Sequence, residues 1–331
     1  MMSFVPCFGN SSVTTKLQVG SIPNKNVISI DTPNVARRPT LTQTRQRSLR
    51  GDPSRRFKNE KILQRGSTSV VSKCTDLVMR KQIALKKVKW PFLSQIKREF
   101  DIQKTVSEHP NIAGVANMLK DFDNREVYIL MELLDGGDLV EVVTRKREGM
   151  NAQVFVSYAR QLASGLLHMH SKGVVHRDIK PDNICSDTTN GSMKFVDFGD
   201  AAYVDETIKK YMIGTMQYIA PELIVAQQMH DSWGDQVLNV DLKACDVWSL
   251  GVTFYSMLSR KLPFKEASLK DTNYSIYQHD NRNLGTQKVW ATFDPEMRTL
   301  LRNMLQIDPR KRWRIGQVVE YLIKWQNKIN P

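Results

Sequence analysis

The sequence predicts an α+β fold with a small strand-rich lobe, a larger helical lobe after it, and a disordered basic tail in front of both. Three observations predict this order. Short runs rich in Val, Ile and Leu fill the first part of the folded region, apolar residues at helical spacing fill the second, and the tail lacks periodic apolar positions. Such a tail cannot bury enough surface to offset the entropy of ordering. The expected divisions are a tail at 1–57, a small lobe at 58–131, a hinge at 132–137, a large lobe at 138–326 and a short end at 327–331.

The tail carries much of the positive charge of the chain. The net charge is +14, and residues 1–58 hold ten Lys or Arg residues against two Asp residues. The basic run Ala36–Lys58 is of the kind that binds nucleic acid or an anionic surface, or directs nuclear import. It is equally consistent with a solvated arm that has no specific partner, and the sequence leaves these alternatives open.

Composition argues against a membrane-spanning or secreted protein. The longest mostly apolar stretch, Trp248–Leu258, is too short to span a bilayer, and the N-terminus lacks a basic start followed by an apolar run. The four cysteines are far apart, without metal-type spacing, which suits a reducing compartment; they are Cys7, Cys74, Cys185 and Cys245. We therefore expect an intracellular monomer without a membrane span, in the cytoplasm or the nucleus.

The elements can be placed in order along the chain. In the small lobe, "EKILQRG", "SVVSKC", "QIALKKV" and "REVYILMEL" predict strands bounded by turn residues, and a helix over Ser94–Val106 is ended by "HPNI". In the large lobe, apolar spacing predicts helices over Asn151–Gly173, Ala244–Phe264 and Asp294–Gln306. A cleft between two such lobes is a natural ligand site.

The stretch Val174–Ala202 carries the densest chemistry. It contains Asp178, Lys180, Asn183 and Asp197. Carboxylate and amide oxygens at these intervals suit hard divalent cations that bridge phosphates. An isolated "HRD" or "DFG" is a common charged turn, but both occur here, in this order and 19 residues apart, and that combination is specific.

These motifs identify a resemblance to the eukaryotic-type Ser/Thr protein kinases, covering about Lys58 to Gln326. "HRDIKPDN" resembles the catalytic loop, "DFG" the metal-binding motif and "GTMQYIAPE" the end of the activation segment, while "DVWSLGV" and "DPRKR" match two further motifs of the large lobe. The wording of "GSTSVVSKC" and "HPNI" is nearest the calmodulin-dependent-type group. The resemblance implies the bilobal protein-kinase fold with ATP and Mg²⁺ as cofactors. It also suits a virus-encoded kinase acting in an infected host cell.

The resemblance implies a role for each residue of this stretch. Asp178 would accept the proton of the substrate hydroxyl, and Lys180 would steady the transferring phosphate. Asn183 and Asp197 would hold Mg²⁺. Thr215 near Lys180 is typical of kinases that modify serine and threonine.

The resemblance also implies an ATP site in the small lobe and hinge. Lys86 in "IALK" would grip the phosphates, and Glu99 would pair with its ammonium group. Glu222 and Arg312 would form an ion pair in the large lobe, and Asp246 would anchor the catalytic loop. The remaining contacts to the nucleotide would come from Gly66, Val71, Ala84, Met131, Glu132, Leu134 and Asp138.

The glycine-rich loop of the family is degenerate in this chain. In "ILQRGSTSVVSKC", Gln64 and Ser69 stand where two of the three glycines would be, and Gly66 is kept. Glycine lets backbone approach phosphate and adopt positive φ. We expect such a loop still to close, with nucleotide affinity about ten-fold lower, or about 1.4 kcal/mol. An active enzyme is favoured because Lys86 and Asp178 are present. A pseudokinase that acts as a binding module and a nucleic-acid-binding tail are the alternatives.

Two other departures concern packing and length. Gln103 falls where the family has an apolar residue against Phe198. The segment between Glu222 and Asp246 is about ten residues longer than usual, and its residues Gln227–Val240 predict an exposed insertion.

Regulation and specificity can also be predicted. The usual phosphorylation site falls on Tyr211, with Thr207 as a second candidate, and a Ser/Thr enzyme would not readily modify its own tyrosine. We expect activity without that phosphate, helped by Asp205 or Glu206. By resemblance, the carboxylates of Asp138 and Asp182 at the peptide groove favour protein substrates with arginine at minus three or minus two. Ser48, within "RQRSLR" of the tail, would then be an autophosphorylation site.

Overall fold

The structure is a computed structural model, and it describes residues 53–66, 68–145, 150–207, 210–233, 239–280, 284 and 287–329. The chain divides into two units, residues 1–44 and 45–331, and the second contains both predicted lobes. The predicted disordered tail lies outside the described residues as far as residue 52, and so does Ser48.

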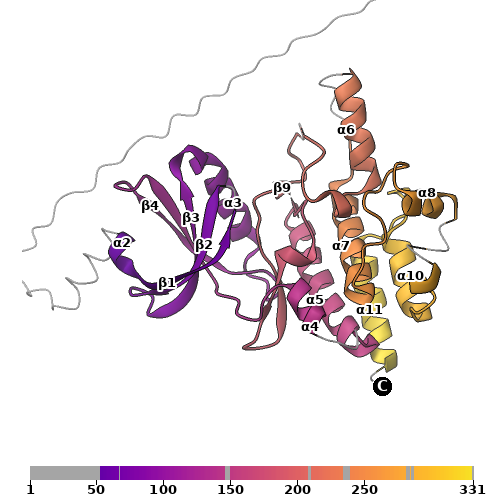
Figure 1. The fold of residues 1–331 in the computed structure, drawn as a ribbon, viewed down its shortest axis with the longest axis horizontal. Helices are drawn as coiled ribbons and strands as arrows, with labels where there is room; N and C mark the ends of the chain where they lie inside the picture. Colours follow the sequence, from indigo (N-terminus) through magenta and orange to yellow (C-terminus); the bar gives the residue numbers. More distant parts are fainter. Residues whose placement is uncertain are drawn as a thin grey trace, which may run out of the picture. The chain divides into compact units, whose positions relative to one another are not determined.

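The small lobe is built on an antiparallel sheet of five strands in the order β1-β2-β3-β5-β4 (Figure 1). Four strands confirm the predicted runs, and the fifth, β4, has no counterpart in the prediction. Its side chains are mixed in burial, so it lacks the clean apolar pattern of a half-buried strand. The strands are β1 (Phe57–Arg65), β2 (Ser69–Asp76), β3 (Lys81–Lys89), β4 (Val115–Asp121) and β5 (Glu126–Met131).

Helix α3 (Leu93–Val106) confirms the helix predicted in this lobe. It follows a 3-10 turn, η1 (Trp90–Phe92). Ile96 of the helix is buried together with Val127 and Ile129 of β5. This packing fixes the distance between α3 and the strands, and therefore places the side chains that α3 presents to the cleft.

The folded region begins earlier than the boundary predicted at Lys58. A short helix, α2 (Pro53–Arg56), leads into β1, and Phe57 is buried. The Arg56 guanidinium makes two bonds to Asp76 at the end of β2, at 2.9 and 2.6 Å, and both side chains are buried. At the other end the last helix continues to Ile329, past the limit predicted at residue 326.

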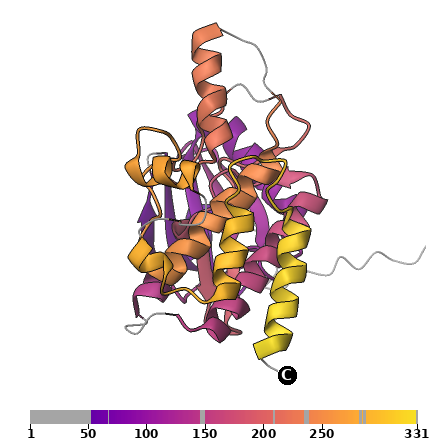
Figure 2. The same cartoon turned by 90° about the vertical axis from the view of Figure 1, so that its right-hand side faces the viewer.

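The large lobe is mostly helical (Figure 2), and it also contains two short strand pairs. The pairs are β6 (Val174–Val175) with β9 (Ala202–Tyr203), and β7 (Ile184–Asp187) with β8 (Ser192–Phe195). Two 3-10 turns, η2 (Pro181–Asn183) and η3 (Met216–Tyr218), lie near them. The helices are α4 (Leu139–Arg145), α5 (Ala152–Ser171), α6 (Pro221–Trp233), α7 (Leu242–Ser259), α8 (Thr272–His279), α9 (Gln287–Trp290), α10 (Pro295–Met304) and α11 (Ile315–Ile329).

The three helices predicted here are present, with one change of length. The helix predicted over Ala244–Phe264 begins two residues earlier, at Leu242, and ends at Ser259, because Arg260 adopts a left-handed conformation with φ of 56°. The start of α7 is capped by Asp241, whose side chain accepts a hydrogen bond from the amide of Ala244.

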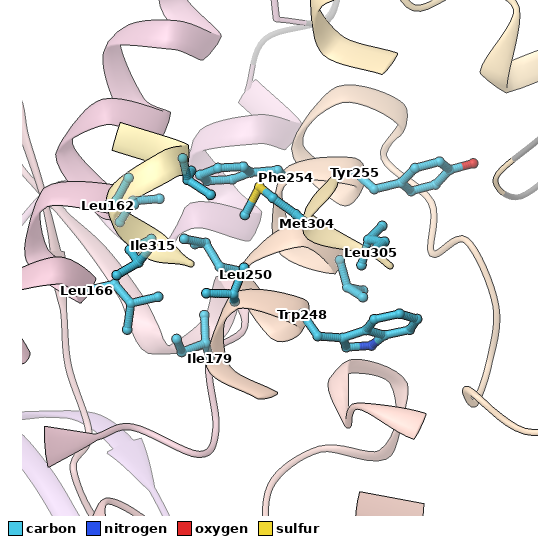
Figure 3. Close-up of a cluster of buried hydrophobic side chains, with 14 of the residues drawn as sticks. Leu162, Leu166, Ile179, Trp248, Leu250, Phe254, Tyr255, Met304, Leu305 and Ile315 are labelled. Carbon is cyan, nitrogen blue, oxygen red and sulfur yellow. The ribbon is translucent and has the colours of Figure 1, made fainter. Parts of the chain in front are cut away.

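Helix α7 runs through the core of this lobe and is buried along most of its length. Figure 3 shows Trp248, Leu250 and Phe254 of α7 in one apolar cluster with residues of α5, α10 and α11. Ile179 also points into this cluster and is fully buried. Because Ile179 stands between Asp178 and Lys180, the core holds the chemistry-bearing stretch directly.

The insertion predicted at Gln227–Val240 begins inside a helix. Helix α6 continues to Trp233, and its outer part stands clear of the neighbouring helices (Figures 1 and 2). Residues 234–238 lie outside the described part. Within the described ranges, no helix is both long and apolar enough to cross a membrane.

Candidate active site

The HRD loop, residues His176–Asn183, is held from below by one buried carboxylate. Asp246 of α7 accepts hydrogen bonds from the backbone amides of His176 and Arg177, each at 2.9 Å. Arg177 has a φ of 68°, a left-handed conformation that costs on the order of 1 kcal/mol in a residue with a side chain. The bonds to Asp246 hold the loop in this conformation, which confirms Asp246 as its anchor.

The Asp178 carboxylate receives four hydrogen bonds. Oδ2 accepts from Lys180 Nζ at 2.7 Å and from Asn183 Nδ2 at 2.8 Å. Oδ1 accepts from the amide and the hydroxyl of Thr215, each at 2.9 Å. Lys180 Nζ also donates to Thr215 Oγ1 at 2.6 Å. A carboxylate has about four lone-pair positions, so Asp178 is fixed in orientation, and an incoming hydroxyl must displace one of these donors.

Gly214 is what allows Thr215 to reach Asp178. Its φ is 97°, and a Cβ built there would lie 2.5 Å from the carbonyl oxygen of Arg177. Any larger residue would therefore clash with backbone. The activation segment, residues 197–222, approaches the HRD loop so closely at Gly214 that only glycine fits at this position.

Asn183 and Asp197 come together because they flank the same end of one hairpin. Asn183 precedes β7, Asp197 follows β8, and the two strands pair through Ile184 and Phe195. The amide of Val196 donates to the carbonyl of Asn183 at 3.0 Å, which extends the pairing by one step. Antiparallel pairing thus places two oxygen-bearing side chains, far apart in sequence, at one edge of the cleft.

Asn183 and Asp197 fit a divalent cation. Asn183 Nδ2 donates to the carbonyl and to the carboxylate of Asp178, so its side-chain oxygen remains for a cation. Burial acts to raise the pKa of Asp197, but the charges of Lys86 and His176 and hydrogen bonds from Lys86 and Gly199 hold it below its ordinary value. An ionised carboxylate and an amide oxygen are the ligands that Mg²⁺ prefers.

Lys86 and Glu99 form the pair expected from the sequence. Lys86 Nζ lies 2.6 Å from Glu99 Oε1 and 3.4 Å from Asp197 Oδ1. Burial acts to lower the pKa of Lys86, but the charges of Glu99 and Asp197 raise it overall. Lys86 is therefore a fixed positive charge that joins Glu99 of α3 to Asp197, the second residue after β8.

The predicted nucleotide pocket is assembled by strand register. Val71 pairs with Lys86, and Ala84 pairs with Met131, so side chains from β2, β3 and β5 share the face towards the cleft. At the hinge the Glu132 side chain binds Lys194 Nζ at 2.6 Å and the Gly114 amide at 2.9 Å. An open cleft of about 450 Å³ beside it includes Leu63, Lys73, Leu134 and Gly137 in its lining.

Asp138 and Gly66, both predicted to contact the nucleotide, each make a hydrogen bond within the chain. Asp138 caps α4, because its carboxylate accepts the amide of Glu141 at 2.8 Å. The Gly66 amide donates to the carbonyl of Ser69 at 2.8 Å, and Gly66 does not have a positive φ. The loop therefore needs no glycine at this position for its backbone conformation in the structure.

Gln103 is buried where the sequence predicted a departure. Its Nε2 donates to the carbonyl of Ala113 at 3.0 Å, and Phe198 is fully buried beside His176, with ring centroids 5.1 Å apart. In the large lobe the predicted pair of Glu222 and Arg312 is present at 2.6 Å. Gln103 and the pair of Glu222 and Arg312 therefore all have hydrogen-bond partners in the structure.

Sequence reasoning missed several residues that support the site. Arg98, Lys194 and Gln227 each bond to a segment far away in sequence. The signal that could have found Arg98 is its position immediately before Glu99, on the helix that faces the cleft.

The sequence of this chain is similar to those of known protein kinases. The model of the protein kinase domain matches residues 57–322. The chain is 30% identical over 276 residues to the putative ribosomal protein S6 kinase alpha-2 of Caenorhabditis elegans, covering 79% of this chain and 34% of that protein. It is 32% identical over 270 residues to ribosomal protein S6 kinase alpha-4 of Mus musculus, covering 77% and 33%. It is 33% identical over 225 residues to CBL-interacting serine/threonine-protein kinase 24 of Arabidopsis thaliana, covering 67% and 46%. The chain therefore spans a third to a half of the length of these relatives.

Proposed function

The chain belongs to the protein kinase domain family, and we propose that it transfers the γ-phosphoryl group of ATP to serine and threonine residues of proteins. The observation that carries the proposal is the group of Lys86, Asp178, Asn183 and Asp197. Lys86 reaches Asp197 at 3.4 Å, and Asn183 donates to Asp178 at 2.8 Å. Phosphoryl transfer depends mainly on positioning and charge, and this group supplies both.

The residues divide the work as follows. Asp178 orients the substrate hydroxyl and takes its proton. The hydroxyl of Thr215, bonded to both Asp178 and Lys180, marks the position that a substrate hydroxyl would take when Thr215 yields it. Lys86 would hold the phosphates of ATP, and Glu99 would hold Lys86. Mg²⁺ bound by Asn183 and Asp197 would supply neutralisation of phosphate charge.

The experiment that tests the proposal is transfer of labelled phosphate from Mg-ATP to a generic basic protein. Wild type is compared with Asp178→Asn, and with Asp205→Asn as a matched control on the exposed part of the activation segment. Wild type and the control should transfer phosphate, and Asp178→Asn should not. Binding of ATP without transfer by wild type would indicate the alternative, a catalytically weak binding module.

The proposed preference for basic substrates is supported by carboxylates on α4 and in η2. Asp138 and Glu141 stand at the start of α4, and Asp182 lies in η2. Burial raises the pKa of Tyr218 to about 12, and the charge of Asp182 acts in the same direction. Arginine upstream of the modified residue can pair with such carboxylates in a bidentate manner.

A peptide array tests this preference. Wild type should favour arginine at minus three or minus two, and Asp182→Asn should weaken selection at one of these positions without changing the others. Mass spectrometry after incubation with Mg-ATP tests modification of Ser48. Selection of acidic or proline-directed sites would contradict the proposal. Binding of nucleic acid by the 36–58 region, location in the cell and the monomeric state stay predictions.

A further inference from the structure

Glu206 joins the activation segment to the helix that carries Glu99. Its Oε2 lies 2.5 Å from Arg98 Nη2, and Arg98 Nη1 donates to the carbonyl of Ala201 at 2.7 Å. Arg98 is the residue before Glu99 on α3, so a bond made by Glu206 acts directly on the turn of helix that positions Lys86. The two ends of this bond are 108 residues apart in sequence.

A second arginine lies in the field of the same carboxylate. Burial is the largest influence on the pKa of Arg177 and lowers it overall; the charge of Arg98 acts in the same direction, whereas Asp200, Asp246 and Glu206 act to raise it. Asp200 and Asp246 act on Arg177 more strongly than Glu206 does, and Arg177 Nη2 donates to the carbonyl of Lys210 at 3.2 Å. Glu206 therefore acts on Arg98 by direct contact and on Arg177 only through its charge.

Two further residues of the segment, Tyr211 and Met212, are tied to α6. The amides of Tyr211 and Met212 donate to Gln227 Oε1 of α6 at 3.0 and 3.1 Å. Tyr211 is buried, with 2% of its surface exposed, and its ring lies 5.9 Å from that of His230. Tyr211, the first position predicted for phosphorylation, is thus closed to a modifying enzyme in this conformation, whereas Thr207, the second candidate, is exposed.

We propose that Glu206 is a built-in positioning residue that holds α3 and the activation segment in the arrangement needed for transfer, so that no activating phosphate is required. The proposal rests on the proposed kinase function. A carboxylate offers one charge and two acceptor oxygens, and a charge-assisted bond to arginine is strong and directional. The side chains of Arg98 and Glu206 are 41% and 37% exposed, so it is the contact and not burial that distinguishes Glu206 from its exposed neighbour Asp205.

The test compares Glu206→Gln with Asp205→Asn in the full chain. Each protein is treated with phosphatase, and its mass is checked for the absence of phosphate. Wild type and Asp205→Asn should be active in this form. Glu206→Gln should lower kcat about ten-fold, while the KM for ATP should change less than two-fold, because the residue acts on α3 and not on the nucleotide. Glu206→Asp, which keeps the charge, should recover part of the loss.

A double-variant cycle identifies the partner. If Glu206 acts through Arg98, the variant with both Glu206→Gln and Arg98→Gln should lose no more activity than Arg98→Gln alone. Losses that multiply would contradict this route. Equal kcat in Glu206→Gln and Asp205→Asn, or a wild type that is inactive until phosphorylated, would overturn the proposal.

Hydrogen exchange separates this proposal from the proposed function. Amides of α3 and of residues 201–207 should exchange several-fold faster in Glu206→Gln than in Asp205→Asn, whether or not the protein transfers phosphate. Equal exchange would overturn the role of Glu206. A wild type that transfers no phosphate in any state, but shows this difference in exchange, would refute the kinase function and leave the contact established.

Discussion

Two hairpins bring residues to the cleft, and they are built in opposite ways. Of the nine residues of β1, only Phe57 is buried. In the described part of the loop that follows, the Gly66 amide donates a backbone hydrogen bond to the carbonyl of Ser69. In β8, three of four residues are buried, and the residues that flank the β7–β8 pair are fixed by Asp178 and Lys86. The first hairpin, β1 with β2, covers the site. The second, β7 with β8, is part of the floor of the site, a name that we use for Lys86, Asp178, Asn183 and Asp197.

The difference explains which departures from the family pattern the chain tolerates. Gln64 is exposed at the end of β1 and pairs with Val71 only through the backbone register. A larger side chain there displaces nothing in the core. Every predicted residue of the floor is kept, because each one bonds to another member of the same group. Gln103 is a departure that is buried, and its Nε2 is satisfied by the carbonyl of Ala113. A sequence change is therefore tolerated where the side chain faces solvent or finds a polar partner, and is costly where side chains of the site bond to one another.

The largest effect should come from the floor. Asp178→Asn and Asp197→Asn should each lower kcat by about 10³-fold or more, since removal of a positioned general base or of a metal-binding carboxylate removes a contribution of this size. Thermal unfolding should stay near that of wild type, because neither change removes an apolar core side chain. Phosphate transfer measured with Asp205→Asn as control checks this. Residual activity above a few per cent of wild type in either variant would contradict the roles assigned to Asp178 and Asp197.

The next effect should come from the base of β1. Arg56→Ala should destabilise the protein by about 3 kcal/mol at pH 7, because it leaves Asp76 buried without its charged partner. Chemical denaturation is the measurement, and Lys58→Ala, on an exposed neighbour, is the matched control. A loss no larger than that of the control would show that β1 is not fastened at this point.

This destabilisation should depend on pH. Burial acts to raise the pKa of Asp76, but Arg56 and the amides of Met79 and Val78 hold it below its ordinary value of about 3.9. A depressed carboxyl pKa contributes stability above the unfolded pKa, and this contribution is lost as the pH falls through the folded value. The difference between wild type and Arg56→Ala should therefore shrink below about pH 4. A difference that is constant with pH would exclude an ionic origin.

A smaller effect is expected from the loop over the cleft. Gln64→Gly should lower the KM for ATP by about ten-fold, or about 1.4 kcal/mol, while kcat changes less. The loop positions phosphate and does not react with it. Steady-state kinetics with ATP as the varied substrate is the measurement. An unchanged or raised KM would mean that Gln64 makes a compensating contact with the nucleotide.

The smallest effect sharpens the comparison further. Gly66→Ala should change the free energy of unfolding by less than about 0.5 kcal/mol, because Gly66 does not have a positive φ and a Cβ there would meet only Ser69, with Oγ at 3.3 Å. Its KM for ATP should rise if backbone approaches phosphate at this point. Gly214→Ala is the contrasting variant and should destabilise the activation segment, since its Cβ would strike the carbonyl of Arg177. Equal effects of the two on stability would contradict the comparison.

The sequence by itself predicted the kinase fold, with a strand-rich part followed by a helical part, and named the motif residues that the structure brings together. Hydrophobic spacing is a local property, so it predicted α3, α5 and α10 close to their observed limits, whereas α7 was predicted to Phe264 and ends at Ser259. The HRD and DFG motifs are also local, and hairpin pairing between β7 and β8 then brings Asn183 and Asp197 together without further information.

Only the tertiary structure decided the contacts that join distant segments. Arg56 binds Asp76, Arg98 binds Glu206 and Gln227 binds the Tyr211 amide, and none of these pairs lies at a spacing that a helix or strand would reveal. The same holds for β4, an edge strand that gains its form from pairing with β5. Local pattern reports which face of an element is buried, whereas the partner of a polar side chain depends on how the elements pack, and that is set by the whole fold.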